Sequence, residues 1–424
     1  MKISFLTHCL PSQDSHGAAE TCYSLIKEFS AKNHEVCLII IGDENEYDLA
    51  KNEKADIKKY VKSFKVFQIP KRKNILKEIL RNPFNFFVPN ENILLPSVSL
   101  EKEVIEELNK NNSDAVFIYH WIAAAPAMNS NIPKLLITGD LVHMPFETRI
   151  LHRKKLGIEV VYSIKFFFTA IGTFWLGYHL RKQMIKIIKK AQAGGSFGFY
   201  DANWIKKRGY KQSTYYKTAL EDTNINFSLS NFKFDKKKKF KIITALSNLQ
   251  STSTLSGLVF LFEEVLHRIK KNIGDENFEI HVIGKGELPK SISHFANDKN
   301  IIMRGYVENL NEEFNTADLV LIPTAIFLGF RCRILNALAQ GACTIIHHYD
   351  AINQPEIIHL KNCLVGKNGK EISELVLKAF HDIELRKKIR TNARTTYLEN
   401  FHPKVATPLI LQTLEDIVKK NEAV

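Results

Sequence analysis

The sequence predicts an α/β protein that contains two Rossmann-like domains. Three observations lead to this prediction. At 424 residues the chain is too long for one compact core. An apolar strand, a polar loop, an amphipathic helix and a second apolar strand open the chain, and this order is typical of a parallel sheet covered by helices. The same order restarts at Phe240 after a hydrophilic stretch, so we expect a second domain of the same kind.

The first half of the chain begins with an apolar strand over Lys2–Thr7. A polar loop that contains Gly17 follows, and then comes an amphipathic helix whose apolar residues recur at helical spacing. A fully apolar strand at Val36–Ile41 completes the β-loop-α-β unit. We therefore assign residues 1–225 to the first domain.

The second half repeats this alternation of strands and helices. After the strand that begins at Phe240, the expected strands are Phe278–Ile283, Ile301–Arg304, Leu319–Ile322 and Thr344–His347. We expect a linker at 226–239, a second domain at 240–400 and a C-terminal helix at 401–424 that packs back on the first domain. The basic run Lys236–Lys239 fits a solvated linker better than a binding patch.

Composition narrows the class of partner. The formal net charge is +14, which favours an anionic partner such as a nucleotide, a phosphate or an acidic lipid. Nucleic acid is also anionic, but it is the least favoured partner because no nucleic-acid-binding module is present. The six cysteines contain no Cys-x-x-Cys pair, which argues against a disulfide framework or a zinc site and favours a cytoplasmic location. The N-terminus is typical of a strand and not of a signal peptide.

One stretch departs from the alternation. Residues 151–190 hold nine Lys or Arg side chains and one acid, Glu159, and Val160–Tyr178 is nearly all apolar. As a membrane-spanning helix it would bury Lys165 at a cost of about 2.5 kcal/mol. A basic, aromatic segment that lies on an anionic membrane surface fits better. The alternative is a buried helix of the first domain with a basic end.

A series of short motifs marks the second half as a ligand-binding domain. Gly284 and Gly286 follow a strand, where a backbone without Cβ atoms approaches a phosphate closely. Arg304-Gly305-Tyr306, Gly329-Phe330 and Pro355-Glu356-Ile357 follow in that order. The whole order resembles the donor-binding half of a retaining glycosyltransferase of the group 1, or GT4, family. The stretch "SHGAAETCYSLIKEFSAKNHEVCLIII" is similar to that family's N-terminal pattern, with Gly17 kept.

The resemblance implies a GT-B architecture, in which two Rossmann-like domains face a cleft. It also implies a hexosyltransferase-like, metal-independent enzyme that needs no cofactor beyond its nucleotide-sugar substrate. The acceptor would be a saccharide or a lipid-linked saccharide at the inner face of the cytoplasmic membrane, in the assembly of surface polysaccharide such as lipopolysaccharide. Two alternatives keep the fold: a degenerate protein that binds without catalysis, and a sugar-nucleotide epimerase.

Two residues of the first domain are catalytic candidates. His120, in "FIYHW", resembles a family histidine near the transferred sugar, although a histidine at a strand end is also common for structural reasons. Asp140, in "ITGDLVH", follows a strand, where the active-site loops of α/β sheets gather. Asp140 would orient an acceptor hydroxyl or cap the next segment.

The donor side departs from the family pattern. Ser247-Asn248 and Ser256-Gly257 stand where the family has Gly-Arg and Lys-Gly, so two cations that neutralise the diphosphate are lost. Leu328 and Asn336 stand where the family has paired glutamates. The asparagine would still hydrogen-bond a ribose, with a neutral bond of roughly half the strength.

Arg331 and Arg333 are the expected compensation for these losses. Both fall near the start of the helix after Gly329-Phe330, where a positive side chain opposes the helix dipole unless an anion is bound. Two arginines grip a phosphate in fork geometry. Alternatively, Arg331 faces water while Arg333 pairs with an acid such as Glu356.

The donor-binding prediction therefore comprises residues from several loops: Gly17, Ser247, Asn248, Gly284, Gly286, Tyr306, Gly329, Phe330, Arg331, Arg333 and Asn336. The hydroxyl run from Ser251 to Thr254 would add donors to phosphate oxygens or act as a helix N-cap. The cluster His347-His348-Tyr349-Asp350 is not assigned a metal, because adjacent residues that leave a strand point to opposite faces.

Overall fold

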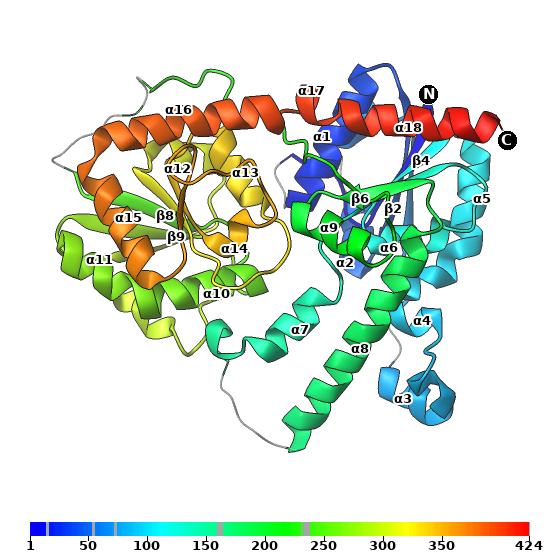
Figure 1. Cartoon of the computed structure of the whole chain (residues 1–424), viewed down its shortest axis with the longest axis horizontal. Coiled ribbons are helices and arrows are strands. Elements are labelled where there is room, and N and C mark those ends of the chain that lie inside the picture. Colours follow the sequence, from blue (N-terminus) through cyan, green and yellow to red (C-terminus); the bar gives the residue numbers. More distant parts are fainter. Residues whose placement is uncertain are drawn as a thin grey trace. The chain divides into compact units, whose positions relative to one another are not determined.

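The computed structural model describes residues 1–13, 17–52, 56–71, 74–158, 164–229, 232 and 238–423. The chain divides into two compact units (Figure 1). The first unit comprises Met1–Met144, Ile171–Glu221 and Pro403–Val424, and the second comprises Pro145–Ala170 and Asp222–His402. Part of the expected linker, 230–231 and 233–237, lies outside the described residues.

The first unit is built on a fully parallel sheet. Its strands are β1 (Lys2–Thr7), β2 (Glu35–Gly42), β3 (Ser63–Gln68), β4 (Ala115–Tyr119), β5 (Lys134–Thr138), β6 (Ala193–Ser196) and β7 (Thr214–Tyr215). They pair in the order β3-β2-β1-β4-β5-β6-β7. The order therefore reverses between β1 and β4, which makes this pair the topological switch point of the sheet.

Helices cover both faces of this sheet. They are α1 (Gly17–Ala31), α2 (Glu44–Asn52), η1 (Asp56–Tyr60), α3 (Ile75–Arg81), η2 (Pro83–Phe86), α4 (Glu91–Leu94), η3 (Pro96–Leu100), α5 (Glu101–Asn111), α6 (Trp121–Ala124), η4 (Ala125–Ala127), α8 (Ile164–Ile188), α9 (Phe199–Lys207), α17 (Pro403–Ala406) and α18 (Pro408–Glu422). Neighbouring residues of a strand join different cores. Ile40 packs with α1 and α18 residues, whereas Ile39 and Ile41 pack with α5 and α8 residues.

The second unit has the same plan. Its strands are β8 (Phe240–Ala245), β9 (Phe278–Ile283), β10 (Ile301–Gly305), β11 (Leu319–Ile322), β12 (Thr344–His347) and β13 (Leu364–Gly366). They are all parallel in the order β10-β9-β8-β11-β12-β13. The switch point lies between β8 and β11. The prediction of an α/β protein with two Rossmann-like sheets is confirmed.

The helices of the second unit again lie on both faces. They are α7 (Met144–Leu151), η5 (Lys154–Leu156), α10 (Thr252–Phe260), the π-helical η7 (Leu261–Val265), α11 (Leu266–Ile273), η8 (Ser293–Asn297), α12 (Leu310–Thr316), α13 (Cys332–Ala339), α14 (His348–Ala351), α15 (Gly369–His381) and α16 (Ile383–Asn400). Ile242 and Ile280 belong to the core beneath α10, α11 and α15, and Ile243 and Ile322 to the core beneath α12 and α13.

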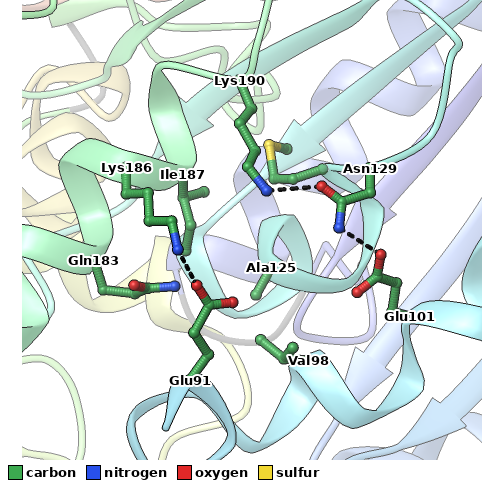
Figure 2. A pocket seen from close by; sticks show the side chains of 10 residues that line it. Glu91, Val98, Glu101, Ala125, Asn129, Gln183, Lys186, Ile187 and Lys190 are labelled. Carbon is green, nitrogen blue, oxygen red and sulfur yellow. Dashed lines mark hydrogen bonds and ion pairs between the residues drawn. The ribbon is translucent and has the colours of Figure 1, made fainter. Parts of the chain in front are cut away.

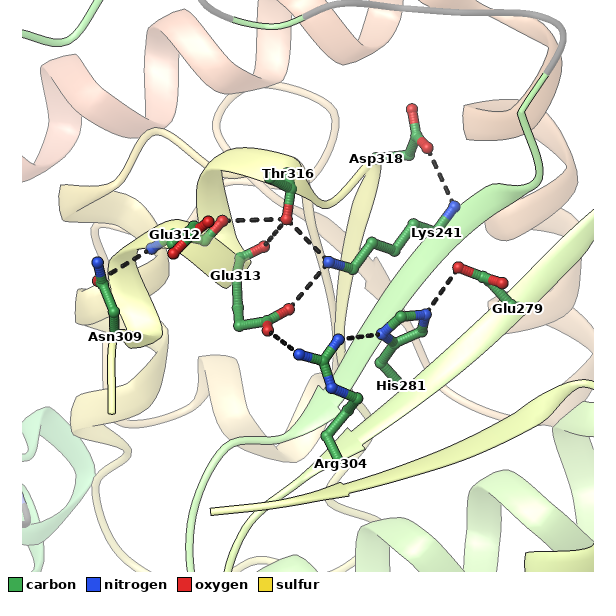
Figure 3. A network of polar contacts seen from close by, with 9 residues as sticks. All are labelled: Lys241, Glu279, His281, Arg304, Asn309, Glu312, Glu313, Thr316 and Asp318. Carbon is green, nitrogen blue, oxygen red and sulfur yellow. Dashed lines mark hydrogen bonds and ion pairs between the residues drawn. The ribbon is translucent and has the colours of Figure 1, made fainter. Parts of the chain in front are cut away.

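A polar network ties one edge of this sheet to α12 (Figure 3). Lys241 Nζ and Arg304 Nη2 each lie 2.9 Å from a carboxylate oxygen of Glu313. The His281 ring lies between Arg304, at 3.2 Å, and the Glu279 carboxylate, at 2.7 Å. Because one buried acid of α12 joins cations from β8 and β10, this network fixes the helix on the sheet.

The boundaries differ from the expected ones. The expected first domain, 1–225, includes residues 145–170 and 222–225, which group with the second unit. Arg149 Nε donates to Thr252 Oγ1 at 3.1 Å, and Lys155 Nζ donates to the carbonyl of Ala325 at 3.0 Å. Residues 403–424 group with the first unit, where Ile410, Leu414 and Ile417 are buried. The polar contacts of Arg149 and Lys155 leave no periodic signal in the sequence, so the grouping of 145–170 with the second unit could not be predicted.

Helix α8 is buried in its C-terminal half and exposed near its N-terminus. Leu180, Met184 and Ile188 in its C-terminal half are buried in the first unit, whereas Phe167 and Phe168 near its N-terminus are exposed. Residues 159–163 lie outside the described residues. Among the helices that the structure describes, none is long and apolar enough to cross a membrane.

Candidate active site

The switch point of the second sheet gathers polar side chains. β8 and β11 are neighbours and run parallel, so the loops that follow them, 246–251 and 323–331, leave the same edge of the sheet. Each loop leads into a helix, α10 after β8 and α13 after β11. The helices begin at Thr252 and Cys332. This edge is where open α/β sheets bind their ligands.

A cluster of hydroxyls surrounds Arg333 at this edge. Arg333 Nη1 donates to Thr254 Oγ1 at 2.9 Å, and Nη2 donates to Thr324 Oγ1 at 3.0 Å. The Thr254 hydroxyl also accepts from Ser251 Oγ at 2.9 Å and lies 2.6 Å from Ser247 Oγ. We call these five residues, Ser247, Ser251, Thr254, Thr324 and Arg333, the second-unit site. They join two loops and two helix starts.

Arg333 is held in this site as a cation. Burial lowers the pKa of its guanidinium to about 10, and the positive charge of Arg331 lowers it as well, while the negative charge of Asp350 raises it. The group therefore stays protonated at neutral pH. It lies in the first turn of α13, at the positive end of that helix. An anion at this position would satisfy the helix and the guanidinium together.

Arg331 has a different role. It is the residue before α13, is 9% exposed, and its Nη2 donates to the carbonyl of Leu328. Its Nε lies 3.6 Å from Asp350 Oδ1. Burial raises the pKa of the Asp350 carboxyl to about 7, against the opposing effect of Arg331 and Arg333. The part of the alternative in which Arg331 faces water is therefore wrong. Arg331 is the buried partner of an acid and closes the loop from Leu328.

The glycines after β9 pack on the loop after β8. Gly284 has a φ of 151°, and a Cβ atom added there would lie 1.9 Å from the carbonyl oxygen of Ser247. Gly286 has a φ of 102° and lies against Asn248. The close approach explains Gly284, and the positive φ explains Gly286, without a ligand. They fix the loop that carries Ser247.

The other donor-side predictions lie around this site in the second unit. Gly329 turns the chain with a φ of 61°. Phe330 and Asn336 are half-buried, while Tyr306 is exposed, with Lys285 Nζ 4.3 Å from its ring centre. Asn248 is exposed, and its Oδ1 accepts from the backbone of Gln250.

Three residues at this edge were not predicted. Thr324 follows β11 and binds Arg333. Arg149 binds the hydroxyl of Thr252, the first residue of α10, and Lys155 binds the backbone at Ala325. The threonine has a weak signal, a hydroxyl just after an apolar strand. The two cations have none, because they are distant in sequence from the loops that they contact.

The switch point of the first sheet holds imidazoles. His8 follows β1 and His120 follows β4, and their rings stack with centres 4.1 Å apart at 28°. His120 Nδ1 accepts from the backbone N–H of Ile122 at 3.5 Å, and its φ is 81°, which is strained for a residue with a side chain. Gly139 leaves room for the ring, since a Cβ there would lie 2.5 Å from His120 Cδ2.

The imidazoles of His120 and His143 are neutral. Burial lowers the pKa of His120 to about 4. His143, which follows β5 and is 4% exposed, stacks on Trp204 at 5.3 Å. Its pKa is lowered to about 3 by burial and by the charges of Arg181 and Arg208. We call His8, His120, Gly139, Asp140 and His143 the first-unit site. Asp140 is half-buried in the same loop as His143.

Gly17 is placed at the start of α1. Its carbonyl accepts from the hydroxyl of Thr21 at 2.8 Å. The residues just before it, 14–16, lie outside the described residues, so the loop predicted to approach the donor phosphates is described only from Gly17 onward.

A separate hollow in the first unit is closed by its own ion pairs (Figure 2). Lys186 of α8 pairs with Glu91, and Lys190 Nζ donates to Asn129 Oδ1 at 2.7 Å. Asn129 in turn donates to Glu101. The hydrogen bond from Lys186 lowers the pKa of Glu91. Because these charges compensate each other, the hollow is not a candidate anion site.

The histidine cluster after β12 is arranged by its own backbone. His347 Nδ1 accepts from the N–H of Tyr349 at 3.3 Å, and burial lowers the pKa of His347 to about 4. Asp350 is directed to Arg331. Within the described residues, no group of three or more His, Cys, Asp or Glu side chains is placed to hold a metal ion.

Comparison with known proteins agrees with this geometry. Residues 241–382 match the model of a family described as glycosyl transferases group 1. We call these matched residues, 241–382, the group 1 domain. The group 1 domain contains the whole second-unit site, together with Gly284, Gly286 and Tyr306. A search of curated protein sequences finds no match.

Solved structures extend the likeness to the whole chain. The HepE protein of Anabaena in complex with UDP aligns with 98% of this chain and 100% of its own, at 12% identity and a TM-score of 0.63. Sucrose-phosphate synthase from Thermosynechococcus elongatus aligns over 99% of both chains, at 10% identity and a TM-score of 0.65. The lipopolysaccharide outer core galactosyltransferase WaaB aligns with 97% of this chain and 100% of its own, at 12% identity and a TM-score of 0.59. These likenesses show the GT-B fold.

Proposed function

We propose that this protein is a retaining GT4-like glycosyltransferase that moves a sugar from a nucleotide-sugar donor to a saccharide or a lipid-linked saccharide. The observation that carries the proposal is the second-unit site. A charged guanidinium and four hydroxyls converge at the switch point of a group 1 domain, beside the starts of α10 and α13. This set of donors suits a diphosphate.

Arg333 carries the main electrostatic role in this proposal. When the bond between the anomeric carbon and the diphosphate breaks, negative charge grows on the leaving group, and a preorganised cation stabilises it. The hydroxyls of Ser247 and Thr254 add hydrogen bonds to phosphate oxygens. Arg149 of α7, which contacts Thr252 at the start of α10, supplies a second cation. The two cations replace the family's Arg and Lys, whose positions here hold Ser247-Asn248 and Ser256-Gly257.

The first-unit site would serve the acceptor. His120 is neutral above about pH 5 because its pKa is about 4, so it acts as a hydrogen-bonding group and not as a cation. Its Nδ1 accepts from the backbone of Ile122, which leaves Nε2 as the N–H donor. Asp140 would orient an acceptor hydroxyl. The proton of that hydroxyl passes to the departing diphosphate as the new glycosidic bond forms, so no metal is needed.

The cellular setting follows from the substrates. Nucleotide-sugars are cytoplasmic, so we place the reaction there, at the membrane face when the acceptor is lipid-linked. The solved relatives include a lipopolysaccharide galactosyltransferase and the HepE protein with UDP-glucose. They support a role in the assembly of surface polysaccharide or another glycoconjugate, with a UDP-hexose as the first donor to test.

A second candidate function is binding without catalysis. One specific observation favours it: Arg331 is committed to Leu328, Phe330 and Asp350 and has little freedom to reach a phosphate. With Leu328 in place of a carboxylate, the site would then recognise a glycan or a partner. A scaffold of this kind should not bind a nucleoside diphosphate in the group 1 domain.

The deciding experiment combines binding and turnover. Calorimetry with UDP, GDP and CMP should reveal micromolar binding of one of them, and the matching nucleotide-sugar should transfer its sugar to a saccharide or lipid-linked acceptor. Nuclear magnetic resonance of the product should show the anomeric configuration of the donor. No nucleotide binding and no sugar transfer would contradict the proposal and support the scaffold. Nucleotide binding without transfer or hydrolysis would contradict both the transferase and this scaffold. A changed sugar-nucleotide without any acceptor would indicate an epimerase.

A further inference from the structure

Large aromatic side chains are exposed in two segments, one in the first unit and one in helix α8, whose first residues, up to Ala170, group with the second unit. One is the turn after α3, where Phe84 is 65% exposed and Phe87 is 71% exposed. The other is α8, where Phe167 is 61% exposed and Phe174 and Tyr178 are also exposed. We call these five residues together with Phe86 the aromatic face. Soluble proteins rarely leave so many large apolar side chains in water without a partner.

The two segments are joined by direct contacts. Trp175 of α8 donates its indole N–H to the carbonyl of Phe86 at 2.7 Å. The Trp175 and Phe86 rings stack with centres 6.0 Å apart at 20°. The turn at Phe84–Phe87 is therefore fixed against the side of α8, and the aromatic residues form one surface instead of two unrelated exposures.

Helix α8 continues this surface as a basic stripe. Phe167, Ile171, Phe174 and Tyr178 follow at spacings of three or four residues, so they lie on one side of the helix. The same spacing leads on to Lys182 and then, two turns later, to Lys189, both of which are exposed. The Lys182 ammonium lies 4.4 Å from the centre of the Tyr178 ring. Figure 1 shows α8 as one continuous helix.

The charge of this stripe identifies its occupant. From Phe166 to Lys190 the helix region contains five Lys or Arg side chains and no acid. Glu91, which approaches the region from outside, is already paired with Lys186. A water-facing aromatic end followed by lysines matches a lipid surface, with the rings among the headgroups and the lysines on anionic phosphates. A second copy of this chain would bring lysines against lysines.

We propose that the aromatic face and the lysines of α8 form a docking surface for an anionic phospholipid membrane. The turn at Phe84–Phe87 and the first turns of α8 enter the headgroup region. Lys182 and Lys189 contact anionic headgroups. The use of this surface rests on the proposed function, because docking would bring the enzyme to a lipid-linked acceptor, but the docking itself does not depend on catalysis.

The chain contains its own probe for this surface. Of the three tryptophans, Trp121 and Trp204 are buried, and Trp175 lies at the aromatic face. Vesicles of phosphatidylcholine with phosphatidylglycerol should shift tryptophan emission to shorter wavelength, and lipids brominated on their chains should quench it. Trp175→Phe should abolish both signals while vesicle binding persists. The protein should bind vesicles of phosphatidylcholine alone more weakly, by about tenfold or more.

Two double variants test the two parts of the surface by vesicle co-sedimentation. Phe87→Ser with Phe167→Ser should weaken binding about tenfold by removing exposed aromatic area. Lys182→Gln with Lys189→Gln should weaken it by a similar factor and reduce its salt dependence. The matched controls Val405→Ser with Leu409→Ser, and Lys419→Gln with Lys420→Gln, change exposed residues of 405–420 and should bind as the wild type does.

The outcomes separate this proposal from the proposed function. Wild-type protein that ignores anionic vesicles, or double variants that bind as the controls do, would overturn the docking surface even if sugar transfer is intact. A second outcome would also overturn it: the wild type binds no vesicles and is a dimer in sedimentation analysis, and the Phe87→Ser, Phe167→Ser variant is a monomer. That result would assign the aromatic face to a second copy of the chain. Transfer to a soluble acceptor should be unchanged in both double variants. If the protein binds anionic vesicles but has no transferase activity, the docking surface is supported and the proposed function is contradicted.

Discussion

The two switch points of the molecule share a backbone plan and differ in chemistry. In each sheet the strand order reverses beside the first strand of the unit, between β1 and β4 and between β8 and β11. In each, the residue after one of these strands has a positive φ without being glycine: His120 at 81° and Leu246 at 59°. The first-unit site contains the neutral imidazoles of His120 and His143 together with Asp140, whereas the second-unit site contains a cation and hydroxyls.

This difference shows that the fold supplies a position and the loops supply the chemistry. A parallel sheet with this strand order brings loop residues together at the switch point whatever their identity. A neutral, partly aromatic site suits a sugar, which has hydroxyls and an apolar ring face. A charged site with hydroxyls suits a diphosphate. The predictions below break this division of roles at each site in turn, starting from the largest effect.

Removal of the cation at the second-unit site should have the largest effect. Arg333→Ala should lower kcat/KM about 100-fold, because a charge-assisted contact to the leaving group is lost. Arg333→Lys should recover only part of the activity, since an ammonium does not span Thr254 and Thr324 as the guanidinium fork does. Initial rates of transfer and nucleotide affinity by calorimetry measure both effects.

Two further arginines calibrate this result. Arg149→Ala should cost less activity than Arg333→Ala, because Arg149 is exposed and bonds the hydroxyl of Thr252, next to the second-unit site. Arg268→Ala changes another exposed arginine, which bonds the backbone of Glu264, and should leave the rates unchanged. A loss from Arg333→Ala no greater than that from Arg268→Ala would remove the phosphate role of the second-unit site.

The sequence predicted the position of this site better than its internal contacts. The strands Phe278–Ile283, Leu319–Ile322 and Thr344–His347 were predicted with the bounds that the structure has, because buried parallel strands are short apolar runs between polar loops. Gly341, which follows the end of α13, has a φ of 59°.

The contacts could not be predicted, because they join residues that are distant in the chain. Arg333 binds a threonine 79 positions earlier and Arg149 binds one 103 positions later. The stacking of His8 on His120 depends in the same way on β1 and β4 being neighbours. A chemical pattern at one position does not reveal such partners. The burial of Arg331 against Asp350 was missed for the same reason, since a helix start alone predicted two equivalent arginines.

Acid should act on the first-unit site more than on the second. The pKa of His143 is about 3 in the folded protein, compared with 6.5 for an ordinary histidine side chain. Below pH 6.5 the unfolded form therefore binds the proton first. The stability that follows is complete above pH 6.5 and is lost as the pH falls toward 3, by about 2 kcal/mol at pH 5. His143→Phe keeps an aromatic ring on Trp204 and removes the titration, so it should flatten this loss.

Urea unfolding at pH 7 and pH 5 measures the effect as a difference of differences. The first-unit signal can be followed through Trp204, which contacts His143. His267→Gln changes an exposed histidine and should lose as much stability between the two pH values as the wild type. A variant His143→Phe with the wild-type pH dependence would show that this imidazole is not held neutral by the fold.

The smallest predicted effect concerns the backbone that both sites share. At positions 120 and 246 alanine keeps the positive φ and its strain, whereas glycine adopts that region freely, so the Gly variant should be more stable than the Ala variant by about 1 kcal/mol at each position. Both members of each pair lack the native side chain, so lost stacking or burial cancels in the comparison. Thermal unfolding of the four variants measures this difference in stability.

The activities of the variants should differ between the two sites. His120→Gly and His120→Ala should lose sugar transfer equally, because both remove the imidazole. Leu246→Gly should retain nucleotide binding, because Leu246 offers the donor no polar group. If alanine is as stable as glycine at position 120 and not at 246, the backbone of the first switch point is not strained and the parallel between the two sites ends at their strand order.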